Sequence, residues 1–599
     1  MLLTVGDAEA MALVLTTLLN LLSLEPDHGT GCQKLMNKAC PEWTASVPKC
    51  VECVKENIDR LKKNCTLAQA EKKCHHPPTP APTPAPEPPA PVLPPLTPDP
   101  SAPRPHLIMW VVDDQGWANI GYHNPEHVQT PVADELAAAG VKLDRHYTYR
   151  WCAPTRSALL TGRLPYHVLQ TTNHVDRGFA MLPAKLKQVG YAAHQIGKWH
   201  LGNLAPWMTP VGRGFDSSLG YLSGGEDHYT QFQKTADVFG CAGVDLYEST
   251  HPALGLNGSY ATFTYTQRAV EIVEEHNASV PLFLYMALQV MHAPQEVPTR
   301  FSALYPAKTY SDDYAIMNGM ASAADEALAN VSSALRAKGM WANTLLIHTP
   351  DNGGPAGQLS SGHSGNNWPL RGGKTNLFEG GVRVAAFVGG GFVPAAVRGT
   401  TLEGYVHACD WHHTFINLAG GDPTDNHAAE GLPPTDSYDM WPYLSGRNES
   451  SPRTQMMLSS EPGFASKGAL PKDPNWNGAL IVGEYKLILG RQTYGFWQAP
   501  IYPNATTNHS AEEPFDCGVV GCLFDIVADP SEYTDVASTQ PAKLKQMLAT
   551  FVALNASRFE APKLATDAGQ CEAYVAANGG FLGPYMTEGG GEMVEVEDA

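Results

Sequence analysis

The sequence predicts an α/β protein built on a large mixed, mostly parallel sheet flanked by helices. Three observations support this prediction. Apolar runs of strand length alternate with helical stretches through the middle of the chain, a proline-rich segment separates this region from a short cysteine-rich one, and shorter strands follow towards the C-terminus. At 599 residues the chain is long enough for one large domain with smaller additions.

The first 31 residues are expected to be a secretory signal region. Their apolar run, 11–24, is shorter than the roughly 20 residues that a membrane span needs. It fits the apolar core of a signal peptide, although Asp7 and Glu9 stand where positive charge is usual. We therefore expect a protein of the secretory pathway, either extracellular or lysosomal.

A cysteine-rich module is predicted at 32–76. The segment is rich in lysine and lacks an obvious apolar core, so we expect three disulfides to stabilise it. Zinc is the alternative, because Cys50 and Cys53 form a C-x-x-C pair and His75 and His76 follow the last cysteine. The module is expected to bind a glycan or the cell surface, or else to act as a solubilising cap. Its cysteines are Cys32, Cys40, Cys50, Cys53, Cys65 and Cys74.

Glycosylation sequons agree with a secretory destination, although each alone is weak evidence. They lie at Asn64, Asn257, Asn277, Asn330, Asn448, Asn504, Asn508 and Asn555.

A proline-rich linker is predicted at 77–105. Alternating proline and alanine favours extended polyproline II and prevents a packed core. The segment therefore acts as a semi-rigid spacer, and the chemistry is expected in the part that follows it.

The catalytic domain is predicted at 106–450, where apolar runs and helical stretches alternate. A smaller antiparallel subdomain is predicted at 451–588, with strands at 479–482 and 485–489. The glycine-rich and acidic tail, 589–599, is expected to be disordered. In the catalytic domain the clearest strands are 106–112, 191–196, 282–288 and 344–348, and the clearest helices are 133–140, 263–276 and 314–338.

The net charge of −20 argues against a surface for nucleic acid, because such surfaces are basic. An anionic substrate must therefore be captured by a local group of cations.

Groups suited to a metal or an anion follow each of the four predicted strands. Singly, each has an ordinary explanation: 351–354 (DNGG) resembles a turn, and a lone histidine is often structural. Ligand sites of parallel sheets lie outside the carboxyl ends of strands, so together these groups are expected to converge. Three carboxylates and one amide oxygen favour calcium or magnesium over zinc. The groups are Asp113 and Asp114, Lys198 and His200, His292, and Asp351 and Asn352.

Cys152 is predicted at the start of a helix, because Pro154 suits a first turn. Unpaired N–H groups there favour an anion. From the residues alone, Cys152 is also compatible with a thiolate nucleophile or with one half of a disulfide.

The segments 152–156 (CAPTR) and 159–163 (LLTGR) resemble the signature of the sulfatase family, in which the cysteine is oxidised to formylglycine. The resemblance extends from about His106 to Met586 and implies an alkaline-phosphatase-like fold. It is strongest to the arylsulfatase B type, the N-acetylgalactosamine-4-sulfatases, through 220–229, 366–374 and 523–526. Further similar segments are 113–117 (DDQGW), 197–202 (GKWHLG), 289–294 (QVMHAP), 351–354 (DNGG), 370–374 (LRGGK) and 378–383 (FEGGVR).

The resemblance implies a sulfuric ester hydrolase acting on a sulfated glycan or an aryl sulfate. A formylglycine hydrate at residue 152 would be the nucleophile, and the formylglycine-generating enzyme would be a partner during maturation. Calcium would be held by Asp113, Asp114, Asp351 and Asn352 together with the modified Cys152. Arg156 and Lys198 would polarise the hydrate, His200 would orient it, and His292 and Lys374 would contact the sulfate, with His292 as the acid for the leaving alcohol.

Two departures from the family pattern concern the pocket and the signature. Thr155 replaces the usual serine but keeps a hydroxyl, which is expected to permit cysteine conversion. Arg150 and Trp151 stand where the similar sequences have a Pro-Leu pair, which adds bulk and charge near the site.

The cysteines after the linker, leaving Cys152 aside, are odd in number. Cys517 and Cys522 are expected to pair locally, and one of Cys241, Cys409 and Cys571 is expected to be free and buried or paired in an unassigned way.

Two other functions compete with sulfate hydrolysis. A phosphodiesterase or phosphonate monoester hydrolase would use a similar site. A glycan-binding protein with an inactive site would leave Cys152 unmodified.

Overall fold

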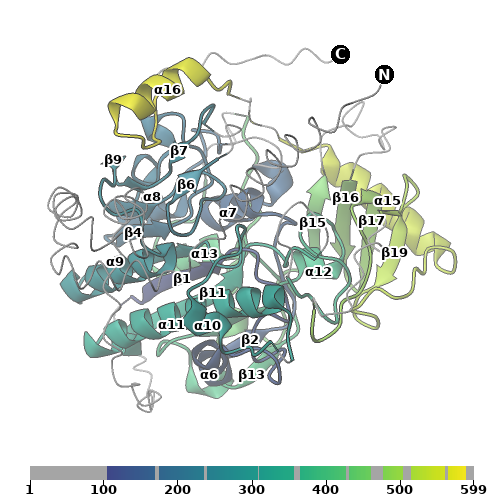
Figure 1. The fold of residues 1–599 in the computed structure, drawn as a ribbon. Helices are drawn as coiled ribbons and strands as arrows, with labels where there is room; N and C mark the ends of the chain where they lie inside the picture. The colour runs from purple at the N-terminus through teal and green to yellow at the C-terminus, as the bar shows by residue number, and fades with distance from the viewer. Residues whose placement is uncertain are drawn as a thin grey trace, which may run out of the picture. The chain divides into compact units, whose positions relative to one another are not determined.

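The computed structural model describes residues 104–587, except for gaps at 169–173, 235–238, 308, 357–364, 426–430, 461–476, 503–513, 560 and 562–563. The predicted signal region, cysteine-rich module, nearly all of the linker and the acidic tail lie outside the described residues, as do the sequons at Asn64, Asn504 and Asn508. Figure 1 shows the elements of the described part.

A ten-stranded mixed sheet forms the centre of the fold, in the order β13-β2-β12-β11-β1-β10-β4-β5-β8-β9. The middle strands β11, β1, β10, β4 and β5 are parallel, which confirms a mostly parallel sheet. The antiparallel pairs lie towards the two edges. The bounds are β1 (His106–Val112), β2 (Val141–Leu143), β4 (Ala192–Gly197), β5 (Ser217–Gly220), β8 (Tyr247–Glu248), β9 (His251–Pro252), β10 (Leu282–Leu288), β11 (Thr344–Pro350), β12 (Ala386–Gly389) and β13 (Thr400–Leu402).

The central strands are buried along their whole length because helices flank the sheet. Alternate residues of β1, such as Leu107 and Met109, share one apolar core with α7, α8 and α13. The helix α11 packs against both α9 and α6, which form a second group with it. These helices are α6 (Pro131–Ala139), α7 (Cys152–Thr161), α8 (Leu182–Gln188), α9 (Ala261–Glu275), α11 (Asp312–Ala337) and α13 (Asp410–Leu418).

The three predicted helices begin two residues earlier than the sequence indicated. Pro131 begins α6, where a missing N–H costs nothing, and the Ser311 side chain accepts a hydrogen bond from the Tyr314 N–H at the start of α11. The remaining short elements of this region are β3 (His146–Tyr147), β6 (Phe232–Gln233), β7 (Gly243–Val244), β14 (Val406–His407), α10 (Thr299–Ser302), α12 (Glu379–Val382), α14 (Trp441–Leu444), η1 (Pro165–His167), η2 (Pro206–Met208), η3 (Val211–Arg213), η4 (Trp341–Asn343) and η5 (Ala395–Val397).

A separate antiparallel sheet follows in the C-terminal part, as predicted. Its apolar residues share a core with Leu377 and Phe378, which lie just before α12. The elements are β15 (Gln455–Ser460), β16 (Asn477–Val482), β17 (Tyr485–Gln492), β18 (Phe515–Asp516), β19 (Cys522–Asp525) and α15 (Pro541–Asn555). The last helix, α16 (Ala568–Ala577), instead packs on the core of the large sheet through Cys571.

Two disulfides lie among the described residues. Cys517 pairs with Cys522, as expected, and Cys241 pairs with Cys571 across 330 residues of chain. Cys409 is free and buried, so the expectation of one such cysteine is confirmed.

The sequon asparagines differ in exposure. Asn257, Asn277, Asn330 and Asn448 are exposed. Asn555 is buried and hydrogen-bonded to Ser460, so the folded chain does not present it to a glycosylating enzyme. Among the described residues, the helices are too short or too polar to cross a bilayer.

Candidate active site

The chemical groups that follow the four central strands meet at one edge of the sheet. Asp113 and Asp114 follow β1, Lys198 follows β4, His292 follows β10, and Asp351 and Asn352 follow β11. Because β1, β4, β10 and β11 are parallel neighbours, their carboxyl ends lie side by side. Residues 85 to 238 positions apart in the sequence are therefore in direct contact.

The buried oxygen atoms of this cluster resemble a site for a hard cation. Ligand atoms of Asp113, Asp114, Asp351 and Cys152 all lie within 4.8 Å of one another, and all four residues are buried. The Asn352 amide donates to Asp114 Oδ1 at 2.8 Å, while its buried Oδ1 has no hydrogen-bond partner among the described residues. Carboxylate and amide oxygens are ligands that calcium and magnesium prefer.

Three cations pair with the three carboxylates. Lys198 Nζ lies 2.6 Å from Asp113 Oδ2, and Lys374 Nζ lies 2.5 Å from Asp114 Oδ1. Arg156 donates to Asp351 Oδ2 through Nε at 3.0 Å and through Nη2 at 2.7 Å.

Two of these pairs favour the ionised form of their carboxyls. Burial alone would raise the pKa of Asp113, but Lys198 and His292 hold that pKa below its usual value. Lys374 does the same for Asp114. Despite its burial, the pKa of Lys374 is in turn raised by Asp114.

Cys152 is the first residue of α7, and Trp151, in an extended conformation, is its N-cap. The Cys152 thiol donates to Asp113 Oδ1 at 3.4 Å. Burial raises the pKa of the thiol to about 12, and the charges of Asp113 and Asp351 add to this effect. The thiol is thus neutral in the folded chain, which disfavours a thiolate nucleophile, and it is in no disulfide.

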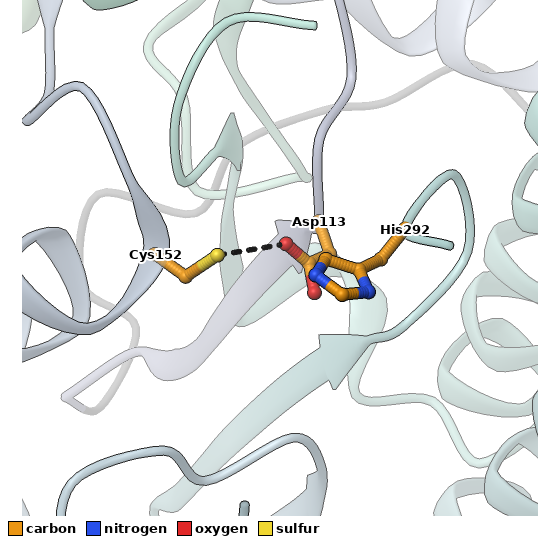
Figure 2. A group of neighbouring side chains, drawn as sticks. All are labelled: Asp113, Cys152 and His292. Atoms are coloured by element: carbon orange, nitrogen blue, oxygen red, sulfur yellow. Dashed lines mark hydrogen bonds between the residues drawn. The ribbon is translucent and has the colours of Figure 1, made fainter. Parts of the chain in front are cut away.

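Two histidines lie on the same side of the cluster. Figure 2 shows the His292 ring beside the Asp113 carboxylate that accepts from Cys152. His292 Nδ1 lies 2.7 Å from the Ala293 carbonyl oxygen, so Nδ1 carries a proton as donor and Nε2 is left for a ligand. His200 has a buried Nδ1 without a hydrogen-bond partner among the described residues. Burial lowers the pKa of both histidines.

A cavity of about 620 Å³ opens above the cluster. Four of the predicted site residues line this one cavity: Cys152, His200, His292 and Lys374. Arg156 and Lys198 lie underneath with fully buried side chains. The remaining walls include Trp151, the segment Gly224 to Asp227, and Phe232 to Lys234.

The family model described as Sulfatase matches residues 105–421. The chain belongs to the sulfatase family. It is 35% identical to arylsulfatase J of Mus musculus over 506 residues, which cover 81% of each protein. It is 29% identical to N-acetylgalactosamine-6-sulfatase of Sus scrofa over 415 residues, 64% of this chain and 72% of that protein.

Solved structures agree with this assignment. A complex of Ps i-CgsB with k-i-k-neocarrahexaose superposes with a TM-score of 0.61 at 25% identity, over 76% of this chain and 94% of that one. The PsFucS1 sulfatase from Pseudoalteromonas sp. shows the same fold, with a TM-score of 0.59 at 23% identity, over 76% and 90% of the two chains. The sequence-based assignment to the sulfatases is therefore confirmed.

The segment 220–229 is identified from the sequence only as a resemblance to the family, and sequence reasoning missed that two of its glycines shape this sulfatase's pocket. A Cβ on Gly224 would lie 2.7 Å from the His200 ring, and one on Gly225 would lie 2.9 Å from the His292 ring. Asp245 holds the turn by accepting from the N–H groups of Leu222 and Ser223 at 2.9 and 2.8 Å. The adjacent Gly-Gly pair was the available signal, because the close approach of two rings leaves room only for glycine.

The wall formed by Phe232 to Lys234 was also missed. The strand β6 is only two residues long, and it is held in place by Gln233, whose side chain donates to the Gly225 carbonyl at 2.5 Å. Nothing in the local sequence pattern indicates this contact with the Gly224–Gly225 turn.

Proposed function

We propose that this sulfatase removes sulfate from a sulfated glycan, using a formylglycine made from Cys152 and a calcium ion. The observation that carries the proposal is the position of Cys152. Its thiol lies at a helix N-terminus, in contact with Asp113 and on the floor of a cavity wide enough for a sugar. Aryl sulfates are expected to be accepted as small substrates of the same site.

Calcium fits the residues present. Asp113, Asp114, Asp351 and Asn352 would hold it with the modified residue 152. The buried Oδ1 of Asn352, which has no partner among the residues that the structure describes, would supply one of the ligand oxygens. When bound, the ion and the hydrated aldehyde would together supply a nucleophilic oxygen and positive charge near the sulfuryl group.

The chain's own residues have roles that follow from their contacts. Lys198 and Arg156 flank Asp113, the carboxylate that contacts residue 152, and the charge of Lys198 acts on that side chain. Lys374, 14% exposed at the cavity, is suited to binding a sulfate oxygen. As sulfur is attacked, negative charge spreads over the sulfuryl oxygens, and these fixed cations stabilise it without reorganisation.

His292 is the residue proposed to protonate the leaving alcohol. Its Nδ1 is committed to the Ala293 carbonyl, so Nε2 is the atom from which a proton would be delivered. Lys374 lines the same cavity and is the alternative donor. His200, with Gly224 against its ring, is proposed to orient the hydrated side chain.

The substrate class is proposed to be a sulfated galactose-type or N-acetylgalactosamine sugar. Two observations support this. The relatives include an N-acetylgalactosamine-6-sulfatase, and one similar structure is a complex with neocarrahexaose. The segment Gly220 to Tyr229, through which the chain resembles the 4-sulfatases of arylsulfatase B type, also supplies part of the cavity wall. Maturation by the formylglycine-generating enzyme would take place in the secretory pathway.

The test is to secrete the protein from cells that contain the formylglycine-generating enzyme and to analyse the peptide around Cys152 by mass spectrometry. We expect an aldehyde at residue 152 and release of sulfate from an aryl sulfate and from sulfated oligosaccharides. Cys152→Ala is expected to abolish release while the protein remains folded. An unmodified thiol in all molecules, or faster turnover of an aryl phosphodiester than of the aryl sulfate, would overturn the proposal.

A further inference from the structure

The cavity is larger than a sulfate group alone requires. Its volume of about 620 Å³ falls within the roughly 300–1,000 Å³ of pockets that enclose whole small molecules. The groups proposed to act on sulfur occupy only its floor. The upper walls must therefore meet the sugar that carries the ester.

Trp151 forms one upper wall. It is half-buried, lines the cavity and directly precedes Cys152 in the chain. The guanidinium of Arg150 lies 4.4 Å from the centre of its ring, and Tyr149 meets the ring edge-on at 5.1 Å. Arg150 is itself buried and donates to the Thr375 carbonyl at 2.5 Å, next to Lys374. The indole is thus held in one orientation as part of the pocket.

A fixed indole beside the reacting residue suits the C–H face of a pyranose. Aromatic rings offer a large apolar surface with a negative face, and sugar C–H groups are its natural complement. A rigid ring loses little conformational entropy when a sugar binds to it.

Lys234 belongs to another stretch of the wall. It follows β6, is exposed and lines the same cavity beside Phe232, which is 38% exposed. The carboxylate of Asp227, also in this wall, already accepts from the Tyr229 N–H at 3.1 Å and from the Thr230 N–H at 2.7 Å. Lys234 is an exposed cation of this part of the wall, where the Asp227 carboxylate serves a local turn. Burial raises the pKa of Glu296, and the charge of Lys234 opposes that rise.

We propose that Trp151 and Lys234 form a subsite for an anionic pyranose: Trp151 stacks on the sulfated sugar, and Lys234 pairs with a second anionic group, a carboxylate or a further sulfate. The subsite rests on the proposed function, because it positions a glycan whose sulfate is removed at residue 152. It predicts a preference for glycans of higher charge over matched monosulfated ones.

The experiment compares kcat/KM on two oligosaccharides that share the cleaved sulfate and differ only in one additional anionic group. The variants are Trp151→Leu, Lys234→Gln, Lys234→Arg and the control Lys545→Gln, an exposed lysine on α15. Rates are divided by the aldehyde content at residue 152, because Trp151 adjoins the modified position.

Lys234→Gln is expected to lower the ratio of the two kcat/KM values by about threefold to fivefold, as for an exposed ion pair. Lys234→Arg is expected to restore this ratio. In the unsubstituted protein, salt at about 0.5 M, where the screening length is roughly 4 Å, is expected to lower the ratio. Trp151→Leu is expected to raise KM for both oligosaccharides by about threefold to tenfold. Lys545→Gln is expected to leave all values unchanged.

An unchanged ratio in Lys234→Gln, or an unchanged KM in Trp151→Leu, would refute the subsite while sulfate release by the unsubstituted protein continues. Absence of sulfate release from every glycan, with aldehyde present at residue 152, would instead refute the proposed function. The two failures are therefore distinguishable.

Discussion

Two groups of buried charges in this sulfatase have similar compositions and different surroundings. In the first, Lys198 pairs with Asp113, which contacts Cys152, a residue that lines the cavity. In the second, Lys486 of β17 lies 2.9 Å from Glu379 and 3.0 Å from Glu532, and all three side chains are fully buried. The Glu379 N–H also donates to Glu532 at 2.6 Å, so this second group joins α12 to the C-terminal part of the chain.

The two groups differ in the surroundings of their polar side-chain atoms. In the first group Asn352 Oδ1 has no hydrogen-bond partner in the described part of the chain, and Cys152 lines the cavity. In the second, Lys486 lies between two carboxylates, and the Glu532 carboxylate also accepts from the backbone N–H of Glu379. Buried charge alone therefore does not indicate catalysis. We expect the first group to determine the reaction rate and the second to determine stability.

Lys198→Ala tests the first part of this contrast, and its effect is expected to be the largest. Removing a preorganised cation from the Asp113 carboxylate beside residue 152 should lower kcat/KM for an aryl sulfate by about 10²- to 10³-fold per folded molecule. The measurement is steady-state turnover, corrected for folded fraction and aldehyde content. A loss smaller than about tenfold would mean that Lys198 only balances the charge of Asp113.

Lys486→Ala tests the second part. It would leave two buried carboxylates without their shared cation, and loss of one partner of a buried pair costs about 3–5 kcal/mol of unfolding free energy. Denaturant unfolding measures this loss. Turnover per folded molecule is expected to stay within about threefold of that of the unsubstituted protein, because Lys486 acts on the reaction only indirectly. A fall in turnover as large as that of Lys198→Ala would break the contrast.

Calcium binding is expected to distinguish the two groups of buried charges further. An ion that binds only the folded state stabilises it by about 2.7 kcal/mol at one hundred times its dissociation constant. We expect added calcium to raise the melting temperature of the chelator-treated protein by several degrees and to restore turnover. Asp351→Asn should remove both responses, whereas Lys486→Ala should keep them. Equal calcium responses in the two variants would show that the ion binds elsewhere.

The sequence located the first group far better than the second. Four apolar runs predicted four buried parallel strands, and the carboxyl ends of parallel strands necessarily meet, so Asp113, Lys198 and Asp351 were expected together. Lys486 lies in an alternating strand, where a lysine is ordinarily expected on the solvent face. Its burial depends on Glu379 and Glu532, which come from distant parts of the chain.

The pocket walls were hard to predict for a related reason. The sequence indicates Trp151 only as a departure from the family pattern, and no sequence pattern indicates Lys234. Both reach the cavity through loops and two-residue strands, whose path is determined by tertiary contacts such as that of Gln233 with Gly225. The burial of Asn555, one of the sequon asparagines, is likewise a property of α15 packing on the C-terminal sheet.

Glu532 gives the smallest expected effect, a dependence of stability on pH. Burial, together with the charge of Glu379, raises the pKa of Glu532 to about 7, and Lys486 opposes this rise. The folded state therefore binds a proton more tightly than the unfolded state, whose pKa is near the ordinary 4.5. This contribution to stability is complete below pH 4.5 and is lost as the pH rises through 7.

The unfolding free energy of the unsubstituted protein should accordingly fall by about 1–3 kcal/mol between pH 4.5 and pH 8 through this group. Glu532→Gln, which carries no titrating proton, should show a smaller fall over the same range, and Lys545→Gln should match the unsubstituted protein. Denaturant unfolding at several pH values measures the three slopes. If Glu532→Gln retained the full dependence, the proton would reside on another group, and the second cluster would hold two ionised carboxylates on one lysine at neutral pH.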